Sequence, residues 1–513
     1  MATSMTFGTV HTWESSPLLS SSRTREQCAT QQRPGEQRIT EQRPASAAGA
    51  ARESSSIPAL VEQTNTVNIN GAVFSTSTRR YILADADSFY ASCERVFHPE
   101  LAHKPVLVLS NNDGCVVTRT AEAKPYIPKG VPWFQIRETA FEHGAVARSS
   151  NYELYGSISA RMMNVMHEFF EHQEVYSIDE CFLETRLPLH DALLQTHRMR
   201  QAVWQGVGIP LSIGIAPTKT LAKIVNHWVK HGNGTAHIGT WDQFDADSQR
   251  RLLQSVPIDE VWGVGRRLTR KLSSMGIINA WDLSQQDPNA IHHRFSVLLQ
   301  RTVLELRGIA CIEDEVSATT GARKDQILCS RMFGHPITGR DTLCQAFSVY
   351  TQDACRRLRR QNGLATSVGI FAGISPYNPD EGGVPLPLTI RTLPTPSDDP
   401  LYIVKFITHE LLPAIDPSTR FIRAGVLLSG LIPSSEYHPF EQFKAQRDDS
   451  HIGQLLDSIN RRYGDHSIGI GYGGVRGTGR AKEEVGASWN MKRAMLSSRS
   501  TTRWDEMMVV KAN

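Results

Sequence analysis

Three carboxylates stand within segments that are otherwise typical of buried strands. Asp85 follows the apolar run Arg80–Ala84, and the pair Asp179-Glu180 interrupts the apolar stretch Glu174–Glu184. A carboxylate in such a setting is costly unless it is paired or binds a cation. Mg²⁺ prefers oxygen ligands, and two Mg²⁺ ions held close together can activate an attacking hydroxyl and stabilise a leaving pyrophosphate. The pattern therefore predicts a site for metal-assisted phosphoryl chemistry.

The elements that must position these carboxylates predict a split βαβ sheet. In chain order the segments are a strand at 80–84, helical spacing over 156–170, a strand or hairpin over 174–184, a strand over 211–215, and a helix that runs through Lys230. Because neighbouring strand residues face opposite sides, Asp179 and Glu180 can serve one site only if the chain turns there. Asp87 is interpreted as a solvated surface charge.

The remainder of the chain divides into three regions of different character. A helical stretch covers about 240–320, a second αβ region covers about 325–435, and a tail from about 436 contains helical spacing at Ile452–Tyr463. In the second αβ region one helix face is marked by the apolar residues Leu343, Phe347, Tyr350, Ala354 and Leu358. Residues 1–78 are dominated by Ser, Gln, Arg, Ala and Pro without an apolar period, so we expect disorder there.

Two basic segments have the chemistry needed for a phosphate backbone. The stretch Ile258–Leu268 reads as a helix-hairpin-helix, in which Gly263 and Gly265 allow a tight turn that presents amide hydrogens to a phosphate. Arg266 and Arg267 follow on the next helix. The second segment ends the amphipathic helix with Arg356, Arg357, Arg359 and Arg360. Four arginines beside an apolar stripe suit DNA phosphates, and equally suit a solvated helix C-terminus.

Composition narrows the class of protein. The chain has 513 residues and a formal net charge of +3, so a nucleic-acid binder of this kind must concentrate its positive charge locally. The eight cysteines contain no C-x-x-C pair, which argues against a zinc ribbon and is typical of isolated thiols in a reducing cytoplasm. No run approaches the length of a membrane span, and Met1–Ser22 lacks a signal-peptide core.

Several motifs together resemble one family. DADSFYASCERVF and YSIDECFLE are similar to the signature pair of the Y-family DNA polymerases. The wider match is to the UmuC-like branch, the catalytic subunit of the bacterial SOS mutagenic polymerase. It is carried by NNDGCVVTRTAEAKPYIPKGVPWF, SIGIAPTKTLAKIVNHWVK, WGVGRRL, CSRMFG, LLDSINRRYG and WNMKRAMLSSRSTTRWDEM. The resemblance covers the chain from about Arg80 to about Lys511.

The resemblance implies roles for individual residues. Asp85, Asp179 and Glu180 would be the catalytic carboxylates and, with the Ala86 carbonyl, would hold two Mg²⁺ ions. Tyr90 matches a steric gate, an aromatic ring that leaves no room for a ribose 2′-hydroxyl, while Phe89 is expected to pack in the core. The triphosphate would be held by Thr118, Lys124 and Lys230. Pro125 and Pro128 predict a shortened helix after Lys124, because proline removes donors and stiffens the chain.

The implied fold is α+β, a right-hand polymerase with a ferredoxin-like palm, small fingers, a helical thumb with the helix-hairpin-helix, and an αβ little finger. The predicted domains are a disordered extension (1–78), palm (79–88 and 150–237), fingers (89–149), thumb (238–322), little finger (325–435) and UmuC-like tail (436–513). The activity implied is error-prone translesion synthesis in DNA repair and the SOS response, adding dNTPs to a primer–template that includes damaged DNA.

The resemblance also implies partners and a location. A UmuD-like accessory dimer, a sliding clamp and a recombinase filament are expected, in a bacterial cytoplasm and near the nucleoid. The branch usually carries a Gln-Leu-x-Leu-Phe clamp peptide; the corresponding stretch EYHPFEQFKAQRDD holds only a degenerate version near Phe440–Phe443. Two alternatives remain at this point: a catalytically inactive DNA-binding scaffold, and a nucleotidyl cyclase, which would need neither the helix-hairpin-helix nor the basic second αβ region.

Overall fold

The computed structural model describes residues 79–232, 234, 237–312, 324–375, 383–437, 452–463, 467–470 and 491–507, and the backbone of two further strands. These residues fall into two compact units, Met1–Asp87 with Gly156–Glu315 and Ser88–Tyr155 with Val316–Asn513. The finer domain boundaries expected from the sequence remain predictions. No helix in the described ranges is long and apolar enough to cross a membrane.

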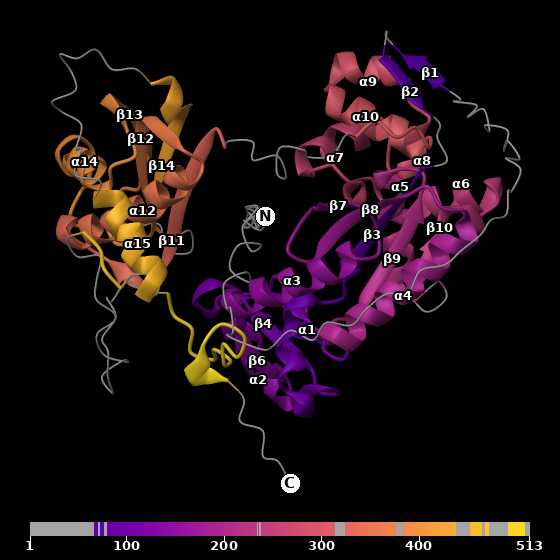
Figure 1. The fold of residues 1–513 in the computed structure, drawn as a ribbon, viewed down its shortest axis with the longest axis horizontal. Helices are drawn as coiled ribbons and strands as arrows, with labels where there is room; N and C mark the ends of the chain where they lie inside the picture. The colour runs from indigo at the N-terminus through magenta and orange to yellow at the C-terminus, as the bar shows by residue number, and fades with distance from the viewer. Residues whose placement is uncertain are drawn as a thin grey trace, which may run out of the picture. The chain divides into compact units, whose positions relative to one another are not determined.

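The first unit is built on a five-stranded sheet of order β10-β9-β3-β8-β7 (Figure 1). The strands are β3 (Arg80–Ala86), β7 (His172–Val175), β8 (Glu180–Thr185), β9 (Leu211–Ala216) and β10 (Ile238–Thr240). The accompanying helices are α3 (Tyr152–His167), which crosses the boundary between the units, α4 (Leu189–Val207) and α5 (Lys219–Lys230). β10 is parallel to β9, and the other pairs are antiparallel. This order confirms the predicted split βαβ arrangement.

Burial explains the two central strands. Along β3 and β9 nearly every residue is buried, so both strands read as continuous apolar runs rather than as alternating patterns. α5 packs on them, and its start is set by the Thr218 hydroxyl, which accepts from the Leu221 amide at 3.2 Å. In β9, a Cβ on Gly214 would lie 2.3 Å from the Ala222 carbonyl oxygen, so only glycine permits this close approach of helix and strand.

The helical stretch of the first unit follows the strands of the sheet in the sequence. Its helices are α6 (Ala246–Ser255), α7 (Arg266–Ser273), α8 (Ala280–Ser284), α9 (Pro288–Arg294) and α10 (Val297–Leu306), with short 3₁₀ turns at Trp241–Gln243 and Ile258–Glu260. Apolar residues of these helices share one core with β3, β8 and α5. The predicted helical character of this region is confirmed.

The second unit contains two separate sheets. A three-stranded sheet of order β5-β4-β6 comprises β4 (Val106–Leu109), β5 (Val116–Arg119) and β6 (Val146–Ser149), with α1 (Phe89–Val96), α2 (Trp133–Glu142) and 3₁₀ turns at Pro99–Leu101 and Asn111–Asp113. After Lys124 the backbone forms consecutive turns over 121–126, so the shortened helix expected beside the prolines is replaced by turns.

The other sheet is four-stranded and fully antiparallel, of order β11-β14-β12-β13. Its elements are β11 (Gln326–Ile337), α12 (Arg340–Arg360), β12 (Gly363–Gly373), β13 (Leu386–Ser397), α14 (Pro400–Phe406), the turns Ile407–Leu411 and Leu412–Ala414, and β14 (Phe421–Pro433) with the turn Ser434–Glu436. The five apolar residues expected on one helix face are all buried on α12, which confirms that face. The tail forms α15 (Ile452–Tyr463), as predicted, and a turn at Trp504–Glu506.

Two short strands depart from the expectation of disorder over 1–78. β1 (Thr66–Ile69) pairs antiparallel with β2 (Ala72–Ser75), so the prediction is wrong for these two strands. The signal was present in the sequence: the dipeptide between them is Asn70-Gly71, which favours a two-residue hairpin. Residues 1–65 lie outside the described residues, as does the degenerate peptide at Phe440–Phe443. The seven cysteines within the described residues are free thiols.

Candidate active site

The predicted carboxylates gather at one end of the five-stranded sheet. Asp85 on β3 lies directly opposite Glu180 on β8 in the antiparallel register. Asp179 was expected inside a strand, but it lies in the turn that connects β7 to β8. Ser177 Oγ closes this turn, because it accepts hydrogen bonds from the backbone amides of Asp179 and Glu180 at 3.2 and 3.1 Å. The Ala86 amide donates to the Asp179 carbonyl oxygen at 2.9 Å. The turn required for Asp179 and Glu180 to serve one site is therefore present.

Burial makes the charged forms of Asp85 and Asp179 unfavourable. Burial raises the pKa of Asp85 to about 8; the neighbouring Glu180 carboxylate adds to this rise and the Lys230 ammonium opposes it. Burial likewise raises the pKa of Asp179, against the hydrogen bond that Ser177 Oγ donates to its carboxylate at 2.5 Å. Buried carboxylates of this kind need a cation, so the environment favours binding one.

Two lysines of α5 place positive charge next to the carboxylates Asp85 and Glu180. Lys230 Nζ lies 2.6 Å from Asp85 Oδ1, and Lys223 Nζ lies 3.1 and 3.2 Å from the two oxygens of Glu180. Within the described ranges no group of three or more His, Cys, Asp or Glu side chains is arranged to hold a metal ion. The donor set nevertheless fits Mg²⁺, since it consists of carboxylate oxygens, with Asp85 buried and Asp179 and Glu180 partly exposed.

Lys223 was not predicted from the sequence. Its ammonium group lies 4.4 Å from the ring centre of Tyr176 and 5.5 Å from that of Trp262, within range of cation–π attraction. Trp262 Nε1 also donates to the Tyr176 hydroxyl at 3.0 Å. The available signal was spacing, because Lys219, Lys223 and Lys230 are four and eleven residues apart along α5 and so share one helix face.

Asp87 is more than the solvated charge that was expected. Its side chain is half-buried and accepts a hydrogen bond from Ser212 Oγ at 2.7 Å. The contact ties the end of β3 to β9, which gives Asp87 a structural role beside the carboxylate cluster.

The predicted sugar gate and two phosphate ligands lie in the second unit. Tyr90 is half-buried on α1 and stacks on Tyr155 with ring centres 4.7 Å apart and an angle of 18°. Phe89 is buried, as expected. Thr118 is half-buried on β5, and Lys124 is exposed in the turns that follow.

The predicted helix-hairpin-helix has the expected local geometry. Gly263 has φ +85°, a left-handed conformation that favours glycine, and Gly265 is the residue before α7. Arg266 and Arg267 begin α7, and both are exposed together with the two glycines. The start of α7 is therefore exposed to solvent and carries two guanidinium groups.

The arginines of α12 differ in their surroundings. Arg359 has a 10% exposed side chain, pairs with Asp457 of α15 at 2.7 and 2.9 Å, and donates to the Asp398 carbonyl oxygen at 2.7 Å. These contacts give Arg359 a structural role, and its role in DNA binding stays a prediction. Arg356 and Arg357 are half-buried, with Arg356 paired to Asp353 at 3.0 Å, and Arg360 is exposed.

Three models of one family match separate parts of the chain. Residues 84–227 match the impB/mucB/samB family, 324–440 match its C-terminal domain, and 246–277 match its helix-hairpin-helix motif. The ImpB protein of Salmonella typhimurium is 37% identical over 441 residues, which cover 83% of this chain and 98% of that protein. The chain belongs to the impB/mucB/samB family.

Further relatives agree with this family assignment. The UmuC protein of Salmonella typhimurium is 36% identical, with 84% of this chain and 100% of that protein covered. DNA polymerase IV of Moorella thermoacetica is 27% identical over 77% of this chain and 98% of that protein. A solved Y-family DNA polymerase chimera matches the fold with a TM-score of 0.51 and 21% identity, covering 69% of this chain and 99% of that chain.

These similarities confirm the predicted family, fold class and enzyme class. This impB/mucB/samB family member is a DNA-directed DNA polymerase of the error-prone, translesion kind. Neither the inactive scaffold nor the nucleotidyl cyclase gains support. Residues 450–510 match a further model described as a domain of unknown function.

Proposed function

We propose that Asp85, Asp179 and Glu180 catalyse nucleotidyl transfer, in which a primer 3′-hydroxyl attacks the α-phosphate of a dNTP and pyrophosphate leaves. The observation that carries this proposal is the register that places Glu180 directly opposite Asp85, a carboxyl group whose charged form burial disfavours. Positioning and charge neutralisation supply most of the rate gain in such reactions.

We propose that two Mg²⁺ ions are coordinated by Asp85, Asp179, Glu180 and the carbonyl oxygen of Ala86. Bound Mg²⁺ would lower the pKa of the attacking hydroxyl and neutralise charge on the leaving pyrophosphate. Lys223 on α5 contacts both oxygens of the Glu180 carboxylate and would orient this group as a metal ligand.

The proposed nucleotide contacts involve the triphosphate and the sugar. Lys230, Thr118 and Lys124 would meet the triphosphate, since an ammonium group and a hydroxyl both donate to phosphate oxygens. Lys230 would exchange Asp85 for phosphate when the nucleotide enters. Tyr90 would exclude ribonucleotides through contact with the sugar, its ring supported by Tyr155.

The proposed DNA contacts position the duplex without reading its sequence. Gly263 and Gly265 would present backbone amides to a phosphate, and Arg266 and Arg267 would add charge. On α12 the exposed Arg360 is the strongest candidate for a DNA phosphate contact, together with the half-buried Arg356 and Arg357.

The biological setting follows from family membership. We infer that the enzyme acts at the bacterial chromosome in the cytoplasm, on templates that include damaged bases. The expected partners are a UmuD-like accessory dimer, a sliding clamp and a recombinase filament.

Primer extension tests the catalytic assignment directly. The double variant Asp179→Ala/Glu180→Ala, assayed with Mg²⁺ and accessory protein, should lose extension while it keeps affinity for primer–template DNA. Asp87→Asn is the matched control, because asparagine still accepts from Ser212 and should retain extension within about tenfold. Extension by the double variant at the wild-type rate would refute the metal assignment.

A further inference from the structure

The C-terminal segment 491–507 is an integral part of the three-stranded sheet region (Figure 1). The Ser149 amide at the end of β6 donates to the Met495 carbonyl oxygen at 3.0 Å, and the Met495 amide donates back to Ser149 Oγ at 3.0 Å. The Ala494 amide donates to Asp113 Oδ2 at 2.9 Å. The Met495 side chain packs against the apolar core of this region. The segment thus covers an edge strand with both backbone and side-chain contacts.

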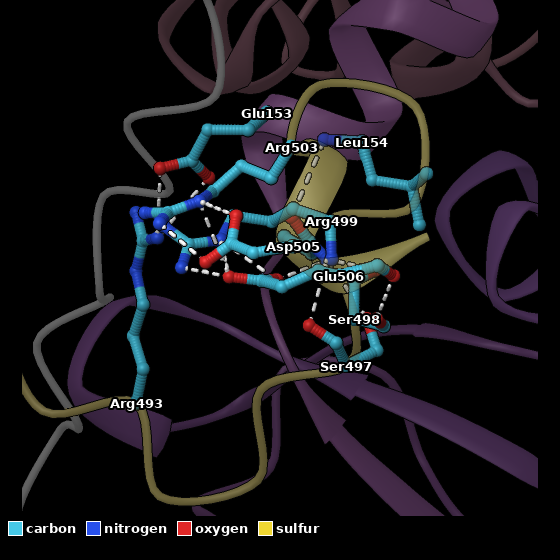
Figure 2. Close-up of polar contacts among 10 residues, drawn as sticks. Glu153, Leu154, Arg493, Ser497, Ser498, Arg499, Arg503, Asp505 and Glu506 are labelled. Atoms are coloured by element: carbon cyan, nitrogen blue, oxygen red, sulfur yellow. Dashed lines mark hydrogen bonds and ion pairs between the residues drawn. The ribbon is translucent and has the colours of Figure 1, made fainter. Parts of the chain in front are cut away.

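Ion pairs stabilise this segment, one between two of its own residues and one to α3 (Figure 2). Arg499 pairs with Glu506, whose carbonyl oxygen also accepts from Ser498 Oγ at 2.7 Å. Arg493 reaches the Glu153 carboxylate on α3 at 3.1 Å. The loop that carries Ser497 is therefore held against the N-terminus of α3.

Asn151 connects the segment to α3. Its side chain is fully buried; Nδ2 donates to Ser497 Oγ at 2.9 Å, and Oδ1 accepts from the Leu154 amide at 3.3 Å. Asn151 therefore caps the helix that carries Tyr155 while it is itself held by the C-terminal segment.

Glu94 provides a second connection, on the other side of Tyr155. Its carboxylate is buried, with 1% exposure, and Oε1 accepts from Tyr155 Oη at 2.6 Å and from Ser497 Oγ at 3.1 Å. Glu94 Oε2 has no hydrogen-bond donor among the described residues; the Arg148 guanidinium lies 3.9 Å away. A buried carboxylate with so few donors depends on each of them.

The same residues support the Tyr90 ring. Tyr90 and Glu94 are one turn apart on α1, on the same helix face. Tyr155 contacts both, since its hydroxyl donates to Glu94 and its ring stacks on Tyr90. A chain of direct contacts therefore runs from Ser497 through Glu94 and Tyr155 to Tyr90.

We propose that the C-terminal segment positions the sugar gate, with Ser497 acting on Tyr90 through Glu94 and Tyr155, and so contributes to the rejection of ribonucleotides. The proposal rests on the proposed role of Tyr90 and assigns a task to residues that match only a domain of unknown function. Ser497 is a positioning residue in this scheme, since it acts on Tyr90 through Glu94 and Tyr155.

The test compares serine variants in the full-length enzyme by primer extension with dNTP and with the corresponding rNTP. Ser497→Ala should raise the ratio of rNTP to dNTP incorporation efficiency by about fivefold, the order expected for the loss of one hydrogen bond. Ser497→Thr keeps the hydroxyl and should restore the wild-type ratio. Ser498→Ala is the matched control, because its hydroxyl contacts Glu506 and not Glu94.

Two further variants separate the possible failures. Tyr155→Phe removes only the hydroxyl bound to Glu94 and should raise the same ratio, which keeps the test valid if Ser497→Ala folds poorly. An unchanged ratio in both Ser497→Ala and Tyr155→Phe, with a raised ratio in Tyr90→Ala, would refute the positioning proposal and leave the gate intact. An unchanged ratio in Tyr90→Ala would refute the gate itself, and the positioning proposal with it.

Discussion

The ammonium group of Lys230 lies 2.6 Å from Asp85 Oδ1, so the residue proposed to hold the triphosphate is bound to a residue proposed to hold metal. An opposite charge at this distance offsets part of the cost of burying the carboxylate. The arrangement keeps the site neutralised before substrate arrives and leaves the lysine to be exchanged for phosphate.

Replacement of Lys230 should therefore affect nucleotide binding more than chemistry. We expect Lys230→Ala to raise the KM for dNTP about tenfold, the effect of one charge-assisted hydrogen bond, with a smaller fall in kcat. Steady-state primer extension measures both constants. Lys129→Ala removes an exposed lysine and should change neither. A fall in kcat at constant KM would contradict the phosphate role.

The two glycines of the hairpin should respond differently to alanine. Gly263 has φ +85°, so Gly263→Ala should lower the free energy of unfolding by roughly 1–2 kcal/mol because a side chain disfavours this conformation. Gly265 has φ −90° with open space around it, and Gly265→Ala should cost about 0.5 kcal/mol or less. Urea unfolding compares them, and equal losses would contradict the role assigned to the Gly263 backbone.

Two neighbouring arginines of α12 should separate stability from DNA binding. Arg359→Ala leaves Asp457 without its partner and should lower the free energy of unfolding by about 2 kcal/mol. Arg360→Ala, at an exposed position, should change the free energy of unfolding by less than about 0.5 kcal/mol. It should lower the affinity for DNA and reduce the slope of log affinity against log salt concentration by about one. Fluorescence anisotropy at several salt concentrations measures the second effect. The opposite pattern would reverse the two assignments.

Glu94 should give the protein a pH-dependent stability. Burial raises the pKa of its carboxyl, against hydrogen bonds from Tyr155 and Ser497 and the charges of Arg148 and His98. The folded state therefore holds this proton to a higher pH than the unfolded state does. The stabilisation that comes from this bound proton is complete at pH values below the ordinary carboxyl pKa and is lost as pH rises through the folded-state pKa of Glu94.

The variant Glu94→Gln isolates this effect, since glutamine accepts the same hydrogen bonds and does not ionise. Its Tm relative to wild type should increase as pH rises above the ordinary carboxyl range. Thermal unfolding at a series of pH values measures the difference, in which the titration of groups common to both proteins cancels. A difference that stays constant with pH would show that the Glu94 carboxyl is not perturbed.

The sequence by itself determined the order of the elements and the residue types at the site. Apolar runs and helical spacing are local signals, and they predicted a strand or hairpin over 174–184, a helix that opens after Thr218 and a helix at Ile452–Tyr463. The three carboxylates were identifiable because charged groups in apolar strands are costly. The missed β1–β2 hairpin also had a local signal, at Asn70-Gly71.

Only the tertiary structure decided which of these groups meet. The register of β3 against β8 places Asp85 opposite Glu180, and the packing of α5 brings Lys230 and Lys223 to them. The ion pair of Arg359 with Asp457 has the same origin, since Asp457 reaches Arg359 only through the packing of α15 on α12. The contact between Ser497 and Glu94 joins residues 403 positions apart. Such pairings depend on strand register and helix packing, which no local pattern encodes.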